Sequence, residues 1–125
     1  MKSRVQGIAG FAYNCIAEVK NKEIESQYSS YVRKLPSMIT HNGLLTTVAF
    51  IKSKASRNEA WETVKSHIER YLKEIEGKSI NGELVKFFAE MELSEYRLYT
   101  KKLLFFAEWL KRIAEGELKY EGDKE

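Results

Sequence analysis

The 125 residues fit one domain, because the chain is too short for two independent ones. Hydrophobic residues make up 43% of the sequence, which excludes disorder as the default, and the lone Cys15 excludes an internal disulfide. The formal net charge is only +3, but residues 1–57 carry nine lysines and arginines against three glutamates.

The first half of the chain predicts three helices. Apolar residues recur at spacings of three and four over about residues 3–22 and again over 24–35. Pro36 then predicts a kink or a fresh start, because its ring clashes with the preceding turn. Asn42-Gly43 is typical of a helix end. Residues 44–51 (LLTTVAFI) suit a buried strand or a buried helix, and we expect a helix because no second strand is apparent to pair with them.

The second half predicts two or three further helices. The spacing of Ser56 and Glu59 is that of a capping box, and the stripe from Trp61 to Ile75 ends at Gly77. A short helix is expected over 80–91, and Ser94 is a suitable N-cap for the last one. Gly116 and a charged tail, residues 120–125, close the chain, and we expect the tail to fray. The predicted fold is all-α, a single-domain bundle of about five to six helices over residues 1–125.

The last helix carries more apolar surface than one face requires. Beside its main stripe runs a second one, made of Leu98, Phe105 and Trp109. A helix that is apolar over so wide an arc is either central to the bundle or shared with a partner. We favour the central position.

The residues needed for enzyme chemistry are scarce. The only aspartate, Asp123, lies in the tail, whereas catalytic metal sites need clustered carboxylates. Neither His41 nor His67 belongs to a catalytic or zinc motif, and Cys15 lies on the apolar face of the first helix. No phosphate-binding glycine loop occurs. We therefore predict a protein without catalytic activity, cofactor or metal. The single cysteine and the lack of an apolar run long enough to span a bilayer favour the cytoplasm.

Positive charge is concentrated where acids are missing. No acid occurs between Glu25 and Glu59, and serines close to Arg33 leave room for a phosphate. An ordinary solvated surface explains the same residues equally well. The candidate nucleic-acid contacts are Arg33, Lys34, Lys52, Lys54 and Arg57, and, with weaker support, Lys101, Lys102, Lys111 and Arg112.

Two blocks of sequence resemble a known family. The first block reads Arg33-Lys34-Leu35-Pro36-x-Met38-Ile39 and Asn42-Gly43-Leu44-x-Thr46-Thr47-x-Ala49-Phe50-x-Lys52-x-Lys54. The second reads Glu95-Tyr96-Arg97-x-Tyr99-Thr100 and Trp109-Leu110-Lys111-Arg112-Ile113-Ala114-Glu115. In their order and separation they resemble the small subunit of the Cmr complex, the type III-B CRISPR effector. The resemblance covers nearly the whole chain, with little signature from Trp61 to Met91.

The resemblance implies a compact helical subunit without nuclease activity. Several copies would stack into a minor filament beside the filament that holds the CRISPR RNA. The duplex of guide and target RNA would lie between the two filaments, contacted by this subunit and by other protein subunits of the complex. The alternatives from other classes are a protein-binding adaptor without RNA contact and, less well supported, a DNA-binding regulator.

Overall fold

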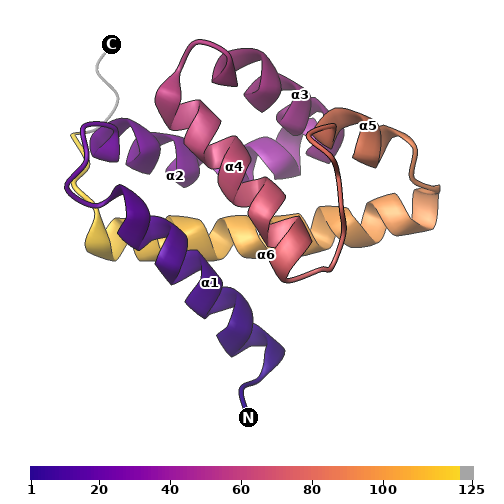
Figure 1. The fold of residues 1–125 in the computed structure, drawn as a ribbon, viewed down its shortest axis with the longest axis horizontal. Helices are drawn as coiled ribbons and strands as arrows, with labels where there is room; N and C mark the ends of the chain where they lie inside the picture. The colour runs from indigo at the N-terminus through magenta and orange to yellow at the C-terminus, as the bar shows by residue number, and fades with distance from the viewer. Residues whose placement is uncertain (122–125) are drawn as a thin grey trace.

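Six α-helices make up the part of the chain that the computed structural model describes, residues 1–121, and no strand occurs in that part (Figure 1). The helices are α1 (Arg4–Val19), α2 (Glu25–Asn42), α3 (Leu44–Ala55), α4 (Glu59–Glu74), α5 (Leu84–Ala89) and α6 (Leu93–Glu117). This arrangement confirms the all-α prediction, including the helical assignment of residues 44–51.

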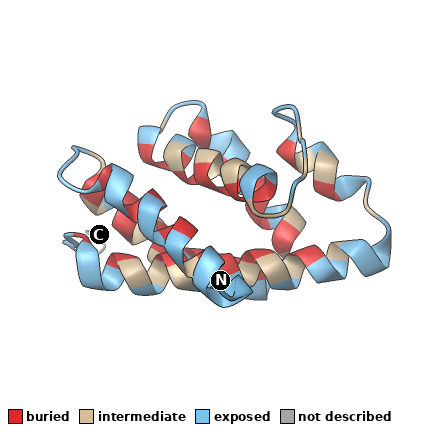
Figure 2. Ribbon diagram, turned by 60° about the horizontal axis from the view of Figure 1, so that its bottom comes forward, coloured by how far each residue is buried: buried red, intermediate tan, exposed pale blue. Residues whose placement is uncertain are grey.

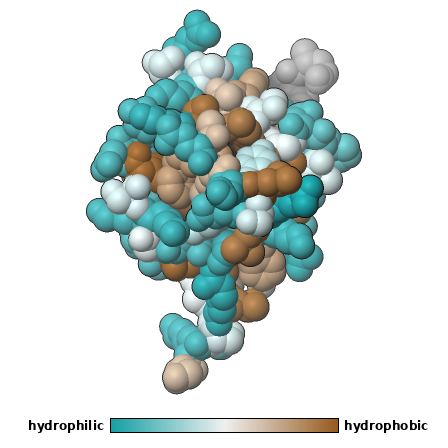
Figure 3. Space-filling model, turned by 90° about the vertical axis from the view of Figure 1, so that its right-hand side faces the viewer, coloured by the Kyte–Doolittle hydropathy of each residue, from teal (hydrophilic) through white to brown (hydrophobic). Residues whose placement is uncertain are grey.

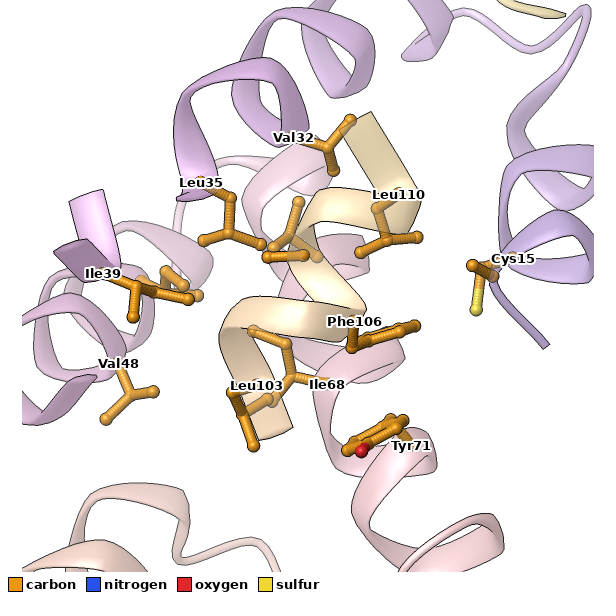
Figure 4. Close-up of a cluster of buried hydrophobic side chains, with 14 of the residues drawn as sticks. Cys15, Val32, Leu35, Ile39, Val48, Ile68, Tyr71, Leu103, Phe106 and Leu110 are labelled. Atoms are coloured by element: carbon orange, nitrogen blue, oxygen red, sulfur yellow. The ribbon is translucent and has the colours of Figure 1, made fainter. Parts of the chain in front are cut away.

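The longest helix, α6, lies at the centre of the packing. It packs most extensively against α2 and also against α1, while α3 packs on α4. Leu103, Phe106 and Leu110 of α6 are buried and point toward side chains of α2 and α4 (Figure 4). The rings of Phe106 and Tyr71 are stacked, with their centroids 4.5 Å apart. The main apolar stripe of the last helix is therefore a core stripe, as its spacing predicted. Other buried residues labelled in Figure 4 are Cys15, Val32, Leu35, Ile39, Val48 and Ile68.

Local signals fix several helix ends. The Ser3 hydroxyl accepts a hydrogen bond from the Gln6 backbone N–H while the Gln6 side chain accepts one from the Ser3 N–H, which starts α1. Helix α1 stops at Val19, somewhat before the predicted end at Lys22, and Asn21 then takes a positive φ of 69°. Gly43, with φ of 87°, separates α2 from α3 as predicted, because a residue without Cβ adopts this backbone conformation without a clash.

Two predicted N-caps are wrong, and of the two alternatives predicted at Pro36 the fresh start does not occur. Helix α2 continues through Pro36 without a fresh start, since Pro36 is buried and α2 is held by its packing on α6. Asn58, rather than Ser56, caps α4 by accepting a hydrogen bond from the Trp61 N–H. Helix α6 begins at Leu93, so Ser94 lies inside its first turn.

The C-terminal end of α6 also differs from expectation. Gly116 lies within α6, which continues to Glu117. Tyr120, at the start of the predicted frayed tail, has its ring 4.0 Å from the Arg33 guanidinium carbon. Residues 122–125 of that tail lie outside the described part of the chain. In Figure 2 the buried faces of the helices turn toward the middle of the bundle, whereas all of residues 1–7 are exposed.

Candidate nucleic-acid interface

The corner between α3 and α4 carries three of the predicted phosphate contacts. Lys52 and Lys54 occupy the last turn of α3, and Arg57 follows in the connection to α4. All three are exposed, and none forms an ion pair with another described residue. Cations suit this place because the C-terminal end of a helix carries partial negative charge. We call Lys52, Lys54 and Arg57 the basic corner.

Aromatic rings hold this corner in place. Trp61 of α4 stacks on Tyr31 of α2, with 4.1 Å between ring centroids, and meets the Phe50 ring of α3 edge-on at 5.4 Å. The Asn58 side-chain amide donates a hydrogen bond to the Tyr31 hydroxyl at 3.0 Å. The Lys54 ammonium lies 5.5 Å from the centre of the Phe50 ring. Contacts among three helices therefore support the basic corner, and the 39% exposed Phe50 adds an aromatic face beside it.

The surroundings of the basic corner are not uniformly positive. Glu59 and Glu62 lie in the first turn of α4, where carboxylates complement the positive helix end. On the other side, the segment between Glu25 and Glu59 contributes no carboxylate. Glu25 itself is buried. Within these two helices and their connection, the basic corner therefore borders acids on its α4 side only.

Arg33 is engaged inside the bundle. Its Nε donates a hydrogen bond to the Ser29 hydroxyl at 3.1 Å, and its Nη1 lies 3.9 Å from a Glu115 carboxylate oxygen of α6. Only 21% of its side chain is exposed, and Ser29 is fully buried. Arg33 is therefore occupied by a hydrogen bond within α2 and a longer contact to α6, so it is less accessible than the basic corner. Lys34, next to it, is exposed.

The cations of α6 lie in a different environment. The Lys102 ammonium forms an ion pair with Glu76 at 3.1 Å and is 24% exposed. Lys101 is exposed and borders a cavity lined mainly by apolar side chains. Arg112 is exposed beside a second such cavity, and Lys111 is half-buried. The structure thus separates the α6 group from the basic corner, a division that residue spacing did not reveal.

The second apolar stripe of α6 reaches the surface. Leu98 is 51% exposed and Phe105 36% exposed, whereas Trp109 is half-buried. Leu93, in the first turn, is 60% exposed. Figure 3 faces the end of the molecule that carries α5 and this first turn, and it shows apolar side chains gathered among polar ones. Helix α6 is therefore central to the core and also exposes a few large apolar side chains among its polar ones.

A chain of polar side chains that begins in the core links α1, α2 and α4, and sequence reasoning missed it. The Tyr28 hydroxyl lies 2.7 Å from Nδ1 of His67, and Nε2 of His67 lies 3.1 Å from a Glu18 carboxylate oxygen. A carboxylate only accepts, so Nε2 carries the proton and Nδ1 accepts from Tyr28. Burial lowers the pKa of His67, against the opposing effect of Glu18.

The same chain continues to Arg70, which donates a hydrogen bond to Glu18 at 2.8 Å and lowers the pKa of that carboxyl. His67 is 1% exposed and has partners on both ring nitrogens, so its geometry is that of a structural histidine. Nearby, burial raises the pKa of the Cys15 thiol to about 12. The only sequence signal for this chain was the position of His67 on the apolar face of its helix.

Glu76 forms a second polar centre, between the helices. Its carboxylate accepts hydrogen bonds from Arg4, Tyr71 and Lys102. Burial alone would raise its pKa, but the Tyr71 and Lys102 hydrogen bonds lower it. Within residues 1–121 no group of three or more histidine, cysteine, aspartate or glutamate side chains is placed to hold a metal ion. No helix in that range is long and apolar enough to cross a membrane.

The comparisons with known proteins agree with this fold. The family model described as "CRISPR-associated protein (Cas_Cmr5)" matches residues 4–117. The chain belongs to the Cmr5 family. A Thermus thermophilus relative named "CRISPR system Cmr subunit Cmr5" is 30% identical over 116 residues, covering 93% of this chain and 96% of the relative. A Thermotoga maritima relative of the same name is 33% identical over 118 residues, covering 92% and 84%.

A crystal structure extends the comparison to the coordinates. It is that of a "CRISPR-associated Cmr5 family protein" from Thermus thermophilus, with a TM-score of 0.82 and 29% identity, and the match covers 95% of this chain and 100% of that one. The resemblance drawn from the two sequence blocks is therefore confirmed. As a Cmr5 family member, the chain is a small subunit of the CRISPR Cmr complex and has other Cmr proteins as partners.

Proposed function

We propose that this Cmr5 subunit is non-catalytic, stacks with further copies of itself into a minor filament, and supports the duplex of CRISPR RNA and target RNA. The contacts to phosphate come from the basic corner, together with Lys34. The observation that carries this proposal is the basic corner itself, three exposed cations that form no ion pair within residues 1–121 and rest on an aromatic support. The subunit works in the cytoplasm, where the reduced thiol of Cys15 is stable.

The chemistry of these contacts suits a protein that must accept any target sequence. Lysine and arginine bind phosphate oxygens without reading base edges, and guide pairing supplies the sequence specificity. One copy offers few such contacts, but tethering in a stack multiplies them. Arg33 already contacts Ser29, Glu115 and Tyr120 and is only 21% exposed, so it ranks below the basic corner.

The non-catalytic role is supported by the state of the titratable groups. His67 is buried with both ring nitrogens occupied, and the Cys15 thiol is buried with a raised pKa. Neither side chain is available to activate a nucleophile or to act as one.

The test is charge reversal at the basic corner in the assembled complex. The variant Lys52→Glu, Lys54→Glu, Arg57→Glu should weaken target RNA binding by about tenfold or more and flatten its salt dependence, because each lost phosphate contact reduces counterion release. Affinity is measured by fluorescence anisotropy at several salt concentrations. The matched control carries the same charge change at other exposed sites, Lys73→Glu, Lys86→Glu and Arg97→Glu. Unchanged affinity in a correctly assembled complex would refute the assignment of the basic corner.

The α6 cations favour a second candidate function, that of a protein-binding adaptor without RNA contact. Lys101 and Arg112 border cavities whose walls are largely apolar, an environment typical of protein interfaces. An adaptor would keep all its partners after nuclease treatment of the purified complex. Loss of this subunit on such treatment would rule the adaptor out.

A further inference from the structure

Two adjoining cavities form a groove between α1 and α6. One has a volume of about 220 Å³ and the other about 230 Å³, and Val5 and Phe105 line both. Ile8 of α1 and Trp109 of α6 extend the apolar lining in opposite directions. We call these two cavities together the α1–α6 groove.

The groove is open to solvent, although the beginning of α1 meets the end of α4 as well as α6: Tyr71 lines one cavity and Glu76 pairs with Arg4. Among the described helices α1 packs mainly on α6, and its first turn is exposed (Figures 1 and 2). Val5 is 48% exposed and Phe105 36% exposed, so apolar side chains of both walls face solvent. Exposed apolar surface of this kind, bordered by polar residues, is typical of a protein-binding site.

The rim of the groove is positively charged. Arg4 and Lys102 both form ion pairs with Glu76. Two positive charges thus face one negative charge, which leaves a net positive charge there. Lys101 and Arg112 are exposed, line different cavities of the groove, and form no ion pair with a described residue. Glu108 is the one acid among the described residues that line the two cavities. The fitting ligand therefore carries negative charge at its edges and apolar groups at its centre.

A protein segment supplies both the apolar centre and the negatively charged edges better than a nucleic-acid backbone does. Phosphates would pair with Lys101 and Arg112 but would leave the exposed Val5 uncovered, because an aliphatic side chain offers no stacking platform. An amphipathic helix covers an apolar groove with side chains at spacings of three and four, and its flanking acids reach the rim. Complementary charge then fixes its orientation.

We infer that the α1–α6 groove is the docking site for an acidic amphipathic segment of another protein subunit of the Cmr complex. The inference rests on the proposed function only in that the chain works inside the assembled complex, and it does not depend on RNA contact. It also assigns Lys101 and Arg112, predicted from sequence as RNA contacts, to protein binding.

Photo-crosslinking in the purified complex identifies the occupant. Phe105 is replaced by the photo-crosslinker p-benzoylphenylalanine, and the crosslinked segment is mapped by mass spectrometry. The matched control places the crosslinker at Leu98, which is exposed on the same helix but lines neither cavity. A crosslink from position 105 to a segment of another subunit with apolar residues at helical spacing and flanking acids is the expected result. A crosslink to a second copy of this chain, a crosslink to RNA, or none at all would overturn the inference.

Charge reversal then tests the rim separately from RNA binding. The variant Lys101→Glu, Arg112→Glu and the variant Phe105→Ser should each lower retention of the subunit in the complex by about tenfold, as for a central interface residue. Retention is measured by native mass spectrometry, with Leu98→Ser and the Lys73→Glu, Lys86→Glu pair as controls. Full retention of both groove variants would overturn the inference. Variants of the basic corner should leave retention unchanged, so the failure of one proposal is distinguishable from the failure of the other.

Discussion

At the scale of single residues, three polar side chains pair across the bundle, two of them buried and one, Glu18, partly exposed. His67, Glu18 and Glu25 each link helices or connections that are distant in sequence. The pKa of each differs from its ordinary value, because folding changes the environment of each group. Stability should therefore depend on pH through a few identifiable side chains.

Because of His67, we expect the free energy of unfolding to fall as pH drops below the usual pKa of histidine. Its pKa is lowered in the folded state from 6.5, so the unfolded chain binds the proton first. Its contribution is complete above about pH 6.5 and is lost as pH falls toward the folded pKa. The free energy of unfolding in urea, measured between about pH 7.5 and 5, should decline over this window.

The control is His67→Gln, which removes the titrating group. We expect it to be less stable by about 1–3 kcal/mol at neutral pH, because buried partners lose hydrogen bonds. It should also lose the decline below pH 6.5, since the pKa values of Glu18, Glu25 and Glu76 are lowered from 4.5 and these groups titrate at more acidic pH. An unchanged slope in this variant would contradict the role of His67.

At the scale of elements, the helix boundaries depend on backbone conformation at few positions. Gly43 joins α2 to α3 with φ of 87° and ψ of 159°, a region that is nearly closed to residues with a Cβ. Gly7, in contrast, lies inside α1 in ordinary helical conformation with no atom within 4 Å of an added Cβ. The two glycines should respond to alanine in opposite directions.

We expect Gly43→Ala to destabilise the fold by about 1–3 kcal/mol through backbone strain. Gly7→Ala should stabilise it by up to about 1 kcal/mol, because alanine has the higher helix propensity and meets no atom there. Chemical denaturation of both variants checks the pair. A stabilising Gly43→Ala would show that the connection between α2 and α3 tolerates another conformation.

At the scale of the whole molecule, Glu25 connects the segment after α6 to the connection between α1 and α2. It lies in the first turn of α2, where a carboxylate suits the helix end, and it is only 6% exposed. One carboxylate oxygen accepts a hydrogen bond from the Asn21 N–H at 2.9 Å and the other from the Lys119 N–H at 2.8 Å. The segment after α6 is thereby fixed against the beginning of α2.

Replacing Glu25 with alanine should cost about 1–3 kcal/mol, because two backbone donors lose their acceptor. Hydrogen exchange at Lys119 should become faster at the same time. The matched control is Glu23→Ala, two residues earlier and exposed, which should change stability by less than about 0.5 kcal/mol. Unchanged exchange at Lys119 would contradict this connection.

The sequence by itself determined the helical class, most helix positions and the family. Apolar residues at spacings of three and four, such as Leu103, Phe106 and Leu110, fix which face of a helix is buried, because that periodicity is local. The two sequence blocks identified the Cmr5 family before any fold was known. The local sequence did not predict the correct N-cap of α4, because two capping residues, Ser56 and Asn58, lie close together in the chain.

Only the tertiary structure decided which charges are available. Arg33 and Lys52 belong to the same basic stretch of sequence, yet one is held by Glu115 across two helices and the other is exposed. The α1–α6 groove likewise forms only when Val5 and Phe105, from opposite ends of the chain, meet. Burial and pairing depend on the packing of distant segments, and no periodicity within one helix contains that information.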